Sequence, residues 1–313
     1  MAIEQLAPRE ELFSGPTPIQ EMWRLRTVLG GGPRLLVKRD DAIPFGFGGN
    51  KVRKLEFVLP EALAANADTL VTLGGLQSNH ARATAAAAAK LGLRCVLIIN
   101  GVPQDRPSGN ALLDRMLGAE IEYITSRAER AAAIERVVTR LQSEGRRPFL
   151  IPLGASTPTG ALGFAAAVDE MLAQGVRPDV IVHAGSSGGT QAGIVAGVAR
   201  NGLSTRVIAV SADDPAASVE TTVRNIVRAI PGCDAFDGKI VVDDTMVGEG
   251  YGIPTSASRE AQQLLARSEA LFVDHTYTAK AAAALIAYAR DGRLSPDETV
   301  LFWHTGGQVG LFA

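Results

Sequence analysis

The feature that most constrains this chain is a repeated alternation of short, continuously apolar runs with longer helical patterns. The runs TLVTLG (69–74) and VIVHAG (180–185) are apolar on consecutive residues rather than on every second one. A strand with this pattern is covered on both faces, as parallel strands in α/β proteins are. The sequence therefore predicts an α/β protein built from βαβ units, with parallel or mostly parallel sheets flanked by helices.

The expected elements follow one another through nearly the whole chain. Strands are expected at 34–40, 69–74, 95–100, 121–124, 148–153, 180–185, 206–212 and 300–306. Helices are expected at 51–65, 78–91, 127–144, 159–173, 189–200, 256–268 and 277–290. A length of 313 residues suggests two domains, but no Pro-rich linker or repeat marks a boundary, so one domain could be inserted within the other.

Composition and charge narrow the class of function. The 31 basic and 33 acidic residues give a formal charge of −2 without a long run of one sign, which argues against nucleic acid or a membrane surface as a partner. No apolar stretch reaches the roughly 18 residues of a membrane span. The N-terminal residues do not have the pattern of a secretion signal. Cys95, Cys233 and the four histidines show no ligand spacing, so we expect a cytoplasmic enzyme with neither a disulfide framework nor a metal.

Three glycine-rich loops stand where an open α/β sheet binds small molecules. GFGGNK (46–51) leads into a helix with Asn50 as the expected N-cap, GSSGGTQAG (185–193) joins a strand to a helix, and HTGGQVG (304–310) follows the last strand. Glycines let backbone N–H groups approach a ligand, and the following helix N-terminus attracts anions. The second loop is therefore either a phosphate cradle or a simple tight turn. The residues of the expected cradle are Ser187, Gly188, Gly189 and Thr190.

A dinucleotide site is the competing interpretation of the same loop. Asp213 and Asp214 follow the next strand at about the distance where a ribose-binding acid would lie. The spacing in GSSGGTQAG, however, matches neither GxGxxG nor a Walker A motif. A nucleotide-binding oxidoreductase, or a non-catalytic binding protein on the same α/β plan, stays an alternative.

Two further motifs could carry chemistry. Lys51 and Lys54 begin a helix in GGNKVRK, where the helix N-terminus and a pocket would lower the pKa of an amine, unless the two merely lie on a solvated face. In GGLQSNH, Ser78, Asn79 and His80 place hydroxyl, amide and imidazole groups just before an alanine-rich helix. Ser78 is an N-cap, a ligand-binding group, or both. His80 either tunes Ser78 or only satisfies a backbone group.

Taken together, the motifs resemble a known enzyme family. GGNKVRKLEF, TLGGLQSNH, IPLGAS, AGSSGGTQAG, GYGIP, DHTYTAK and FWHTGG are similar to stretches of the D-cysteine desulfhydrase and 1-aminocyclopropane-1-carboxylate (ACC) deaminase family, which uses pyridoxal 5'-phosphate (PLP). The resemblance covers nearly all of the chain. It implies the two-domain PLP fold type II, like the tryptophan synthase β subunit, and a homodimer. Residues 1–50 and 162–313 would form the larger PLP-binding domain, and residues 51–161 a smaller inserted α/β domain.

The resemblance also implies a role for each matching residue. Lys51 would form the covalent bond to PLP and move protons at Cα, and Lys54 would help to bind the phosphate. Asn79 would hydrogen-bond the ring hydroxyl and Thr305 the pyridine nitrogen. The implied catalytic residues are Lys51, Ser78, Tyr251 and Tyr277. The residues implied to contact the substrate are Ser78, Asn79, His80, Tyr251 and Tyr277.

Two positions favour the desulfhydrase branch. Relatives in the ACC deaminase branch carry glutamine and leucine where this chain has His80 and Thr305. A neutral hydroxyl at the ring nitrogen makes the ring a weaker electron sink, which favours short-lived carbanions that expel a β leaving group. We therefore expect α,β-elimination on a small β-substituted amino acid. The first candidate substrate is D-cysteine, which would give pyruvate, sulfide and ammonia. The second is L-cysteate, which would release sulfite, and the third is ACC. A sulfonate substrate would need a further cationic hydrogen-bond donor. Arg82 is either that donor or a solvated side chain.

Overall fold

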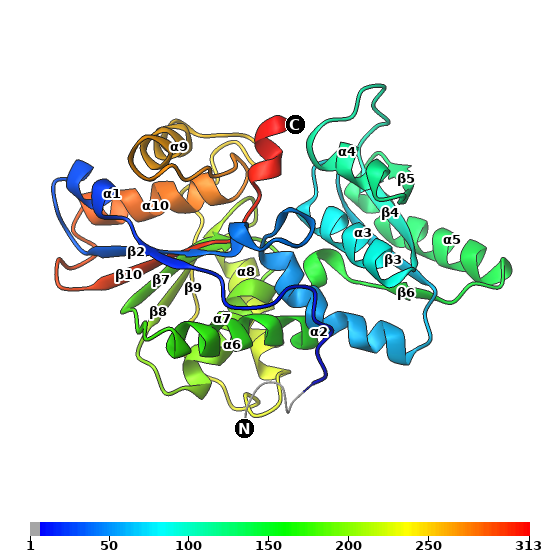
Figure 1. Ribbon diagram of the computed structural model, residues 1–313, viewed down its shortest axis with the longest axis horizontal. Coiled ribbons are helices and arrows are strands. Elements are labelled where there is room, and N and C mark those ends of the chain that lie inside the picture. Colours follow the sequence, from blue (N-terminus) through cyan, green and yellow to red (C-terminus); the bar gives the residue numbers. More distant parts are fainter. Residues whose placement is uncertain (1–6) are drawn as a thin grey trace.

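The computed structural model describes residues 7–313, which form two α/β lobes, each with its own sheet (Figure 1). The strands of the larger sheet are, in spatial order, β1 (Ile19–Glu21), β2 (Arg34–Arg39), β10 (Thr299–His304), β7 (Val180–Gly185), β8 (Arg206–Ser211) and β9 (Val241–Asp243). Those of the smaller sheet are β5 (Glu120–Ile124), β4 (Arg94–Asn100), β3 (Thr69–Gly75) and β6 (Pro148–Leu150). Every neighbouring pair is parallel except β1 with β2. The predicted α/β class with mostly parallel sheets is confirmed.

Helices alternate with these strands as the sequence indicates. They are α1 (Trp23–Val28), α2 (Asn50–Ala64), α3 (Asn79–Leu91), α4 (Gly109–Met116), α5 (Arg130–Ser143), α6 (Pro158–Ala173), α7 (Gly189–Arg200), α8 (Ala216–Arg228), α9 (Ser256–Glu269) and α10 (Thr278–Arg290). All predicted helices and strands are present with ends shifted by a few residues. The sequence analysis missed β1, β9, α1, α4 and α8. The first three have only three to six residues, which is too few to show a periodicity. In contrast, α8 buries valines and an isoleucine at helical spacing, so this helix could have been predicted from the sequence.

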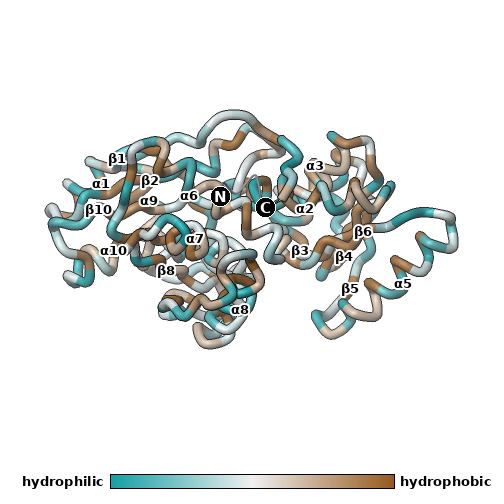
Figure 2. The backbone as a smooth tube through the Cα atoms, turned by 90° about the horizontal axis from the view of Figure 1, so that it is seen from below, coloured by the Kyte–Doolittle hydropathy of each residue, from teal (hydrophilic) through white to brown (hydrophobic). Residues whose placement is uncertain are grey.

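The continuous apolar runs reflect burial on both faces of each sheet. Val180 packs on the side of α9 and α10, and Ile181 packs on the side of α6, α7 and α8. In the smaller sheet, Leu70 faces α2 and α3, and Val71 faces α5. Figure 2 shows hydrophobic residues along β3 and β4, inside the smaller lobe. Since successive strand residues point to opposite faces, only a run apolar at every position fills both cores.

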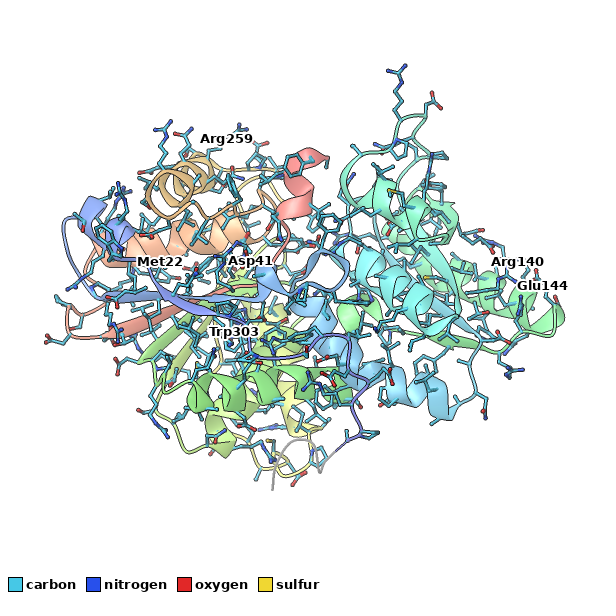
Figure 3. All side chains as sticks on the ribbon, in the orientation of Figure 1. Met22, Asp41, Arg140, Glu144, Arg259 and Trp303 are labelled. Carbon is cyan, nitrogen blue, oxygen red and sulfur yellow. The ribbon has the colours of Figure 1, made fainter. Side chains whose placement is uncertain are left out.

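A buried charge cluster fastens α2 to the larger lobe. The Arg53 guanidinium donates to both oxygens of Asp40 at 2.8 and 2.9 Å and to Glu170 at 2.9 Å. Glu170 also accepts from Lys38 at 2.6 Å, and the Trp303 indole donates to Asp40 at 2.8 Å. Trp303 lies within the larger lobe (Figure 3). Because each buried charge has an opposite partner, the cluster holds one end of α2 in place without an orphaned ion.

Glycines bring α2, α6 and α7 into close contact. A Cβ atom at Gly163 would lie 2.1 Å from the Arg53 carbonyl oxygen, and one at Gly193 would lie 2.1 Å from that of Ala161. Backbone therefore replaces side chains at these helix crossings. The domain division predicted at residues 51 and 161 stays a prediction; it separates the strands of the two sheets, and its second limit falls inside α6.

Candidate active site

A cavity of about 800 Å³ opens between the two lobes. The segments that line it follow β3 and β5 in the smaller lobe and β7, β8 and β10 in the larger lobe. The carboxyl ends of both parallel sheets therefore meet at one cleft, which is where open α/β sheets bind ligands. The predicted site residues that line it are Lys51, Lys54, Ser78, Asn79, His80, Ser187, Gly188, Thr190, Tyr251, Tyr277 and Thr305. Gly189 lies just outside this lining.

Lys51 reaches the cavity from the first turn of α2. Gly49, with φ of 97°, is the N-cap of this helix, so the predicted N-cap at Asn50 is wrong. Asn50 is instead the first helical residue, and its side-chain amide donates to the Thr190 hydroxyl at 3.0 Å. Burial lowers the pKa of the Lys51 amine to about 8. A sizeable fraction of this amine is therefore unprotonated near neutral pH and is available as a nucleophile or base.

Lys54 lies where the glycine loop meets the smaller lobe. Its Nζ donates to the Gly154 carbonyl and to the Ser156 hydroxyl, both at 3.1 Å, and the Ser156 and Ser187 hydroxyls are 2.8 Å apart. Burial, and then the neighbouring charge of Lys51, hold the pKa of Lys54 well below its usual range. A Cβ atom at Gly189 would lie 2.8 Å from Lys54 Nζ, so the loop needs glycine to approach the amine.

The loop after β7 has the geometry of an anion cradle. Gly188, with φ of 79°, is the N-cap of α7, and its left-handed backbone turns the chain into the helix. The first turn of that helix lies beside Ser187, Thr190 and the Lys54 amine, and its Gly189 N–H donates to the Ser187 carbonyl and the Ser156 hydroxyl. A phosphate monoester finds backbone N–H groups, hydroxyls and the Lys54 amine there. With Lys51 across the cavity, the donor set fits a phosphorylated aldehyde such as PLP.

Asn79 is oriented by a residue that the sequence analysis missed. Asn110, fully buried at the start of α4, donates its Nδ2 to Asn79 Oδ1 at 2.8 Å and to the Gln77 carbonyl at 2.9 Å. With its oxygen already accepting this bond, Asn79 keeps its own Nδ2 to donate into the cavity. That polarity suits the acceptor oxygen of a PLP ring hydroxyl. No spacing in the sequence pointed to Asn110, which is 31 residues away.

Ser78 and His80 have defined hydrogen-bonding states. The Ser78 hydroxyl accepts from the Ala81 amide at 3.1 Å, so Ser78 is the N-cap of α3 and its own hydrogen stays free for a ligand. Because Thr72 donates its hydroxyl to the Ile151 carbonyl, it must accept from His80 Nε2, 2.8 Å away. Burial, and then the charges of Lys51 and Lys54, hold the pKa of His80 well below its usual range, so the imidazole is neutral. His80 therefore bonds Thr72 rather than Ser78.

Two tyrosines and a neutral hydroxyl complete the walls. The hydroxyls of Tyr251 and Tyr277 are 2.6 Å apart, and burial together with Tyr251 raises the pKa of Tyr277 well above 10. Both phenols are therefore protonated at neutral pH. Thr305 lies behind the Lys51 turn, where its carbonyl accepts from the Asn50 amide at 2.9 Å. His304 orients this loop by accepting from the Gly306 amide at 3.2 Å.

Neither interpretation of Arg82 is correct. Its side chain is 1% exposed and outside the cavity lining, and it donates to the Gly48 carbonyl at 3.2 Å. Burial lowers the pKa of this guanidinium to about 10. The arginines that line the cavity are instead Arg127 and Arg130, which were not predicted from the sequence. Arg127 pairs with Asp213 at 3.1 Å across the cleft.

Within residues 7–313 no group of three His, Cys, Asp or Glu side chains could hold a metal ion. No helix in this range is long and apolar enough to cross a membrane. Cys95 and Cys233 are both buried and unpaired with each other.

A lysine amine facing an anion cradle between two α/β lobes defines the class of PLP-dependent enzymes. The family model described as "Pyridoxal-phosphate dependent enzyme" matches residues 11–306, and the chain belongs to this family. Among its relatives, the D-cysteine desulfhydrase of Salmonella choleraesuis (strain SC-B67) is 38% identical, over 98% of this chain and 96% of the relative. The ACC deaminase of Burkholderia multivorans (strain ATCC 17616 / 249) is also 38% identical, over 99% of this chain and 97% of the relative.

Solved structures agree with this assignment. The crystal structure of an ACC deaminase homologue matches with a TM-score of 0.91 and 33% identity, over 99% of this chain and 95% of that chain. The predicted PLP fold type II is confirmed by this likeness. A fungal L-serine ammonia-lyase from Rhizomucor miehei, with a TM-score of 0.70 and 17% identity over 97% of this chain and 96% of that chain, shares the fold alone.

Proposed function

We propose that the protein is a carbon–sulfur lyase that converts D-cysteine and water to pyruvate, sulfide and ammonia. Overall identity does not separate the two kinds of relative, because the desulfhydrase and the ACC deaminase are equally similar. His80 and Thr305, the two positions that favour the desulfhydrase branch, both line the cavity. The proposal of the desulfhydrase branch therefore rests on these two site residues.

The charges that line the cleft support the choice of leaving group. Arg127 is paired with Asp213, and Asp214 also lines the cavity beside them. The carboxylates thus offset the charge of the nearby arginines. A cysteine thiol is uncharged before elimination, whereas a sulfonate would bring a full negative charge toward two aspartates. This observation favours cysteine over cysteate.

The residues have complementary tasks in the proposed reaction. PLP, when bound, supplies an electron-withdrawing ring that stabilises negative charge at the substrate Cα. Lys51 Nζ takes the proton from Cα, which its lowered pKa allows near neutral pH. The free hydrogen of Ser78 and the N-terminus of α3 bind the substrate carboxylate. The amide of Asn79 holds the ring hydroxyl, and the Lys54 amine and the 187–190 loop hold the phosphate.

The tyrosine pair serves the leaving group. One of the two phenol hydrogens is used in the bond between Tyr251 and Tyr277, and the other is left to face a ligand. As the Cβ–S bond breaks, sulfur takes the electron pair, and a hydrogen bond from a phenol stabilises its new negative charge. Raised pKa values keep both phenols protonated for this task.

A substrate panel tests the proposal. Purified holoenzyme is given D-cysteine, L-cysteine, L-cysteate, β-chloro-D-alanine and ACC, and pyruvate, sulfide, sulfite and 2-oxobutyrate are measured separately. We expect equal amounts of pyruvate and sulfide, with the highest kcat/KM on D-cysteine. Lys51→Ala removes this activity, and Lys239→Ala, at an exposed lysine, retains it. A higher kcat/KM for sulfite release from L-cysteate, or for 2-oxobutyrate release from ACC, would contradict the proposal.

We further propose that the protein acts in the cytoplasm as a homodimer. Two buried free cysteines suit a reducing compartment. Exposed apolar side chains gather where the C-terminal turn (Gln308–Phe312) lies against α4, and such a patch is typical of a covered surface. Its members are Leu112, Met116, Leu311 and Phe312. Light scattering after size exclusion should give twice the monomer mass, and a monomer at micromolar concentration would contradict this proposal.

A further inference from the structure

Lys280 is a buried cation that the proposed reaction does not use. It lies on α10, three residues after Tyr277, and its side chain is completely buried. Its Nζ donates to three backbone carbonyls: Ala212 at 3.0 Å, Val247 at 2.8 Å and Gly250 at 2.8 Å. An ammonium has three hydrogens, and each finds a carbonyl oxygen here.

The three carbonyls belong to two loops that form walls of the cavity. Ala212 is the first residue after β8 and directly precedes Asp213, which lines the cavity. Val247 and Gly250 lie in a segment without regular secondary structure that leads to Tyr251. Lys280 therefore joins the loop of Tyr251 and the loop of Asp213 to the helix that begins after Tyr277.

Removal of the ammonium has a clear physical consequence. Three carbonyl dipoles converge on one buried point, where they repel one another unless a cation lies between them. The segment at 244–252 forms no helix or strand. Besides Lys280, it is held by turn hydrogen bonds, by the Ala216 amide, which donates to Asp244, and by Met246, which packs on the core beside α9 and α10. The position of Tyr251 against Tyr277, with hydroxyls 2.6 Å apart, thus depends on a charge at the centre of this carbonyl cage.

We propose that Lys280 is a positioning residue, a tethered cation that sets the Tyr251–Tyr277 pair and thereby the leaving-group end of the substrate pocket. The carbonyl cage follows from the three hydrogen bonds of Lys280 alone. Its link to the leaving group rests on the proposed function. The group that the cage binds is a primary ammonium, held by carbonyl oxygens. A small soluble ammonium of the right length should therefore replace the side chain.

Two variants separate the cation from the stem that carries it. Lys280→Ala removes the three methylenes and the amine that propylammonium would restore. Lys280→Met keeps a stem of similar length without the charge, so added amine finds no space. We expect kcat/KM on D-cysteine to fall about 100-fold in both, as for a displaced catalytic group. PLP absorbance should be retained, because Lys280 is outside the cavity lining. Propylammonium should restore Lys280→Ala saturably, propanol should not, and neither should restore Lys280→Met. Lys239→Ala is the matched control.

Readouts that need no substrate keep this test independent of the proposed function. Propylammonium, but not propanol, should raise the melting temperature of Lys280→Ala even if that variant is inactive or poorly folded. Hydrogen exchange should accelerate at amides 245–252 in Lys280→Met and stay unchanged in α5. Wild-type kcat/KM in Lys280→Met would overturn the proposal, as would a Lys280→Ala protein that propylammonium neither stabilises nor reactivates. A different preferred substrate with normal amine rescue would overturn only the proposed function.

Discussion

Replacing Asn110 by aspartate should reverse the polarity of Asn79 without removing any atom from the cavity wall. Asn110 donates to Asn79 Oδ1 at 2.8 Å, and this bond leaves the Asn79 Nδ2 free to donate to a ligand. A carboxylate at position 110 can only accept. The Asn79 amide must then turn over, donate its Nδ2 to the new carboxylate, and direct its oxygen at the PLP ring hydroxyl.

The contacts set the size of the effect. Asn110→Asp removes the donor to the Gln77 carbonyl, which is 2.9 Å away, and leaves that partly buried oxygen facing a carboxylate. An unsatisfied buried acceptor costs about 1–3 kcal/mol, so the free energy of unfolding should fall by about that much. At the cofactor, losing a hydrogen bond to a charged group costs about 1.5–3 kcal/mol. PLP should therefore bind about 10- to 100-fold more weakly.

Absorbance titration of the apo protein with PLP measures the second effect, and urea unfolding of the apo protein measures the first. Asn110→Leu is the matched variant, because it removes the same donor but places no acceptor opposite Asn79. Its loss of PLP affinity should be clearly smaller than that of Asn110→Asp. Equal PLP affinity in wild type, Asn110→Leu and Asn110→Asp would show that Asn110 does not determine which end of Asn79 meets the cofactor.

Three further predictions concern the amine, the charge cluster and the helix contacts. Since the pKa of Lys51 is about 8, stopped-flow absorbance should show covalent capture of PLP by the apo protein accelerating from pH 7 to 9 and then levelling off; a flat profile would contradict this. Burial opposes ionisation of Glu170, but Arg53 and Lys38 overcome it and lower its pKa from 4.5 to about 2. The stabilisation, about 3 kcal/mol, is therefore complete above the unfolded pKa of 4.5 and is lost as pH falls toward 2. Urea unfolding should show the advantage of wild type over Glu170→Gln shrinking in that window, and an advantage that persists at pH 2 would contradict the assignment. Gly163→Ala places a methyl group 2.1 Å from the Arg53 carbonyl and should lower the free energy of unfolding by about 1–3 kcal/mol. Gly101→Ala, whose added Cβ atom would meet only side-chain atoms at 3.4 Å or more, should be close to wild type in the same assay.

The α/β class and most of the helices and strands could be predicted from the sequence. Burial on both faces of a strand leaves a local signature, an apolar residue at every position, as at Val180 and Ile181. The glycine loop at 185–190 and the lysine at position 51 were also recognisable, because an anion cradle and a nucleophile at a helix start are properties of a few consecutive residues. Short elements such as β9 were missed, since three residues carry no periodicity.

The hydrogen-bonding partners of these residues became visible in the tertiary structure and could not be predicted from the sequence. Arg82 is followed by a run of alanines and has no local sign of its burial against the Gly48 carbonyl, which is 34 residues away. Asn110, which lies on another helix, orients the Asn79 side chain. Lys280 donates to carbonyls that are 30 to 68 residues away in the sequence. Hydrogen bonds of this kind depend on where the tertiary fold brings separate helices and loops together. Periodicity records which face of an element is buried, but it carries no information on what lies opposite that face.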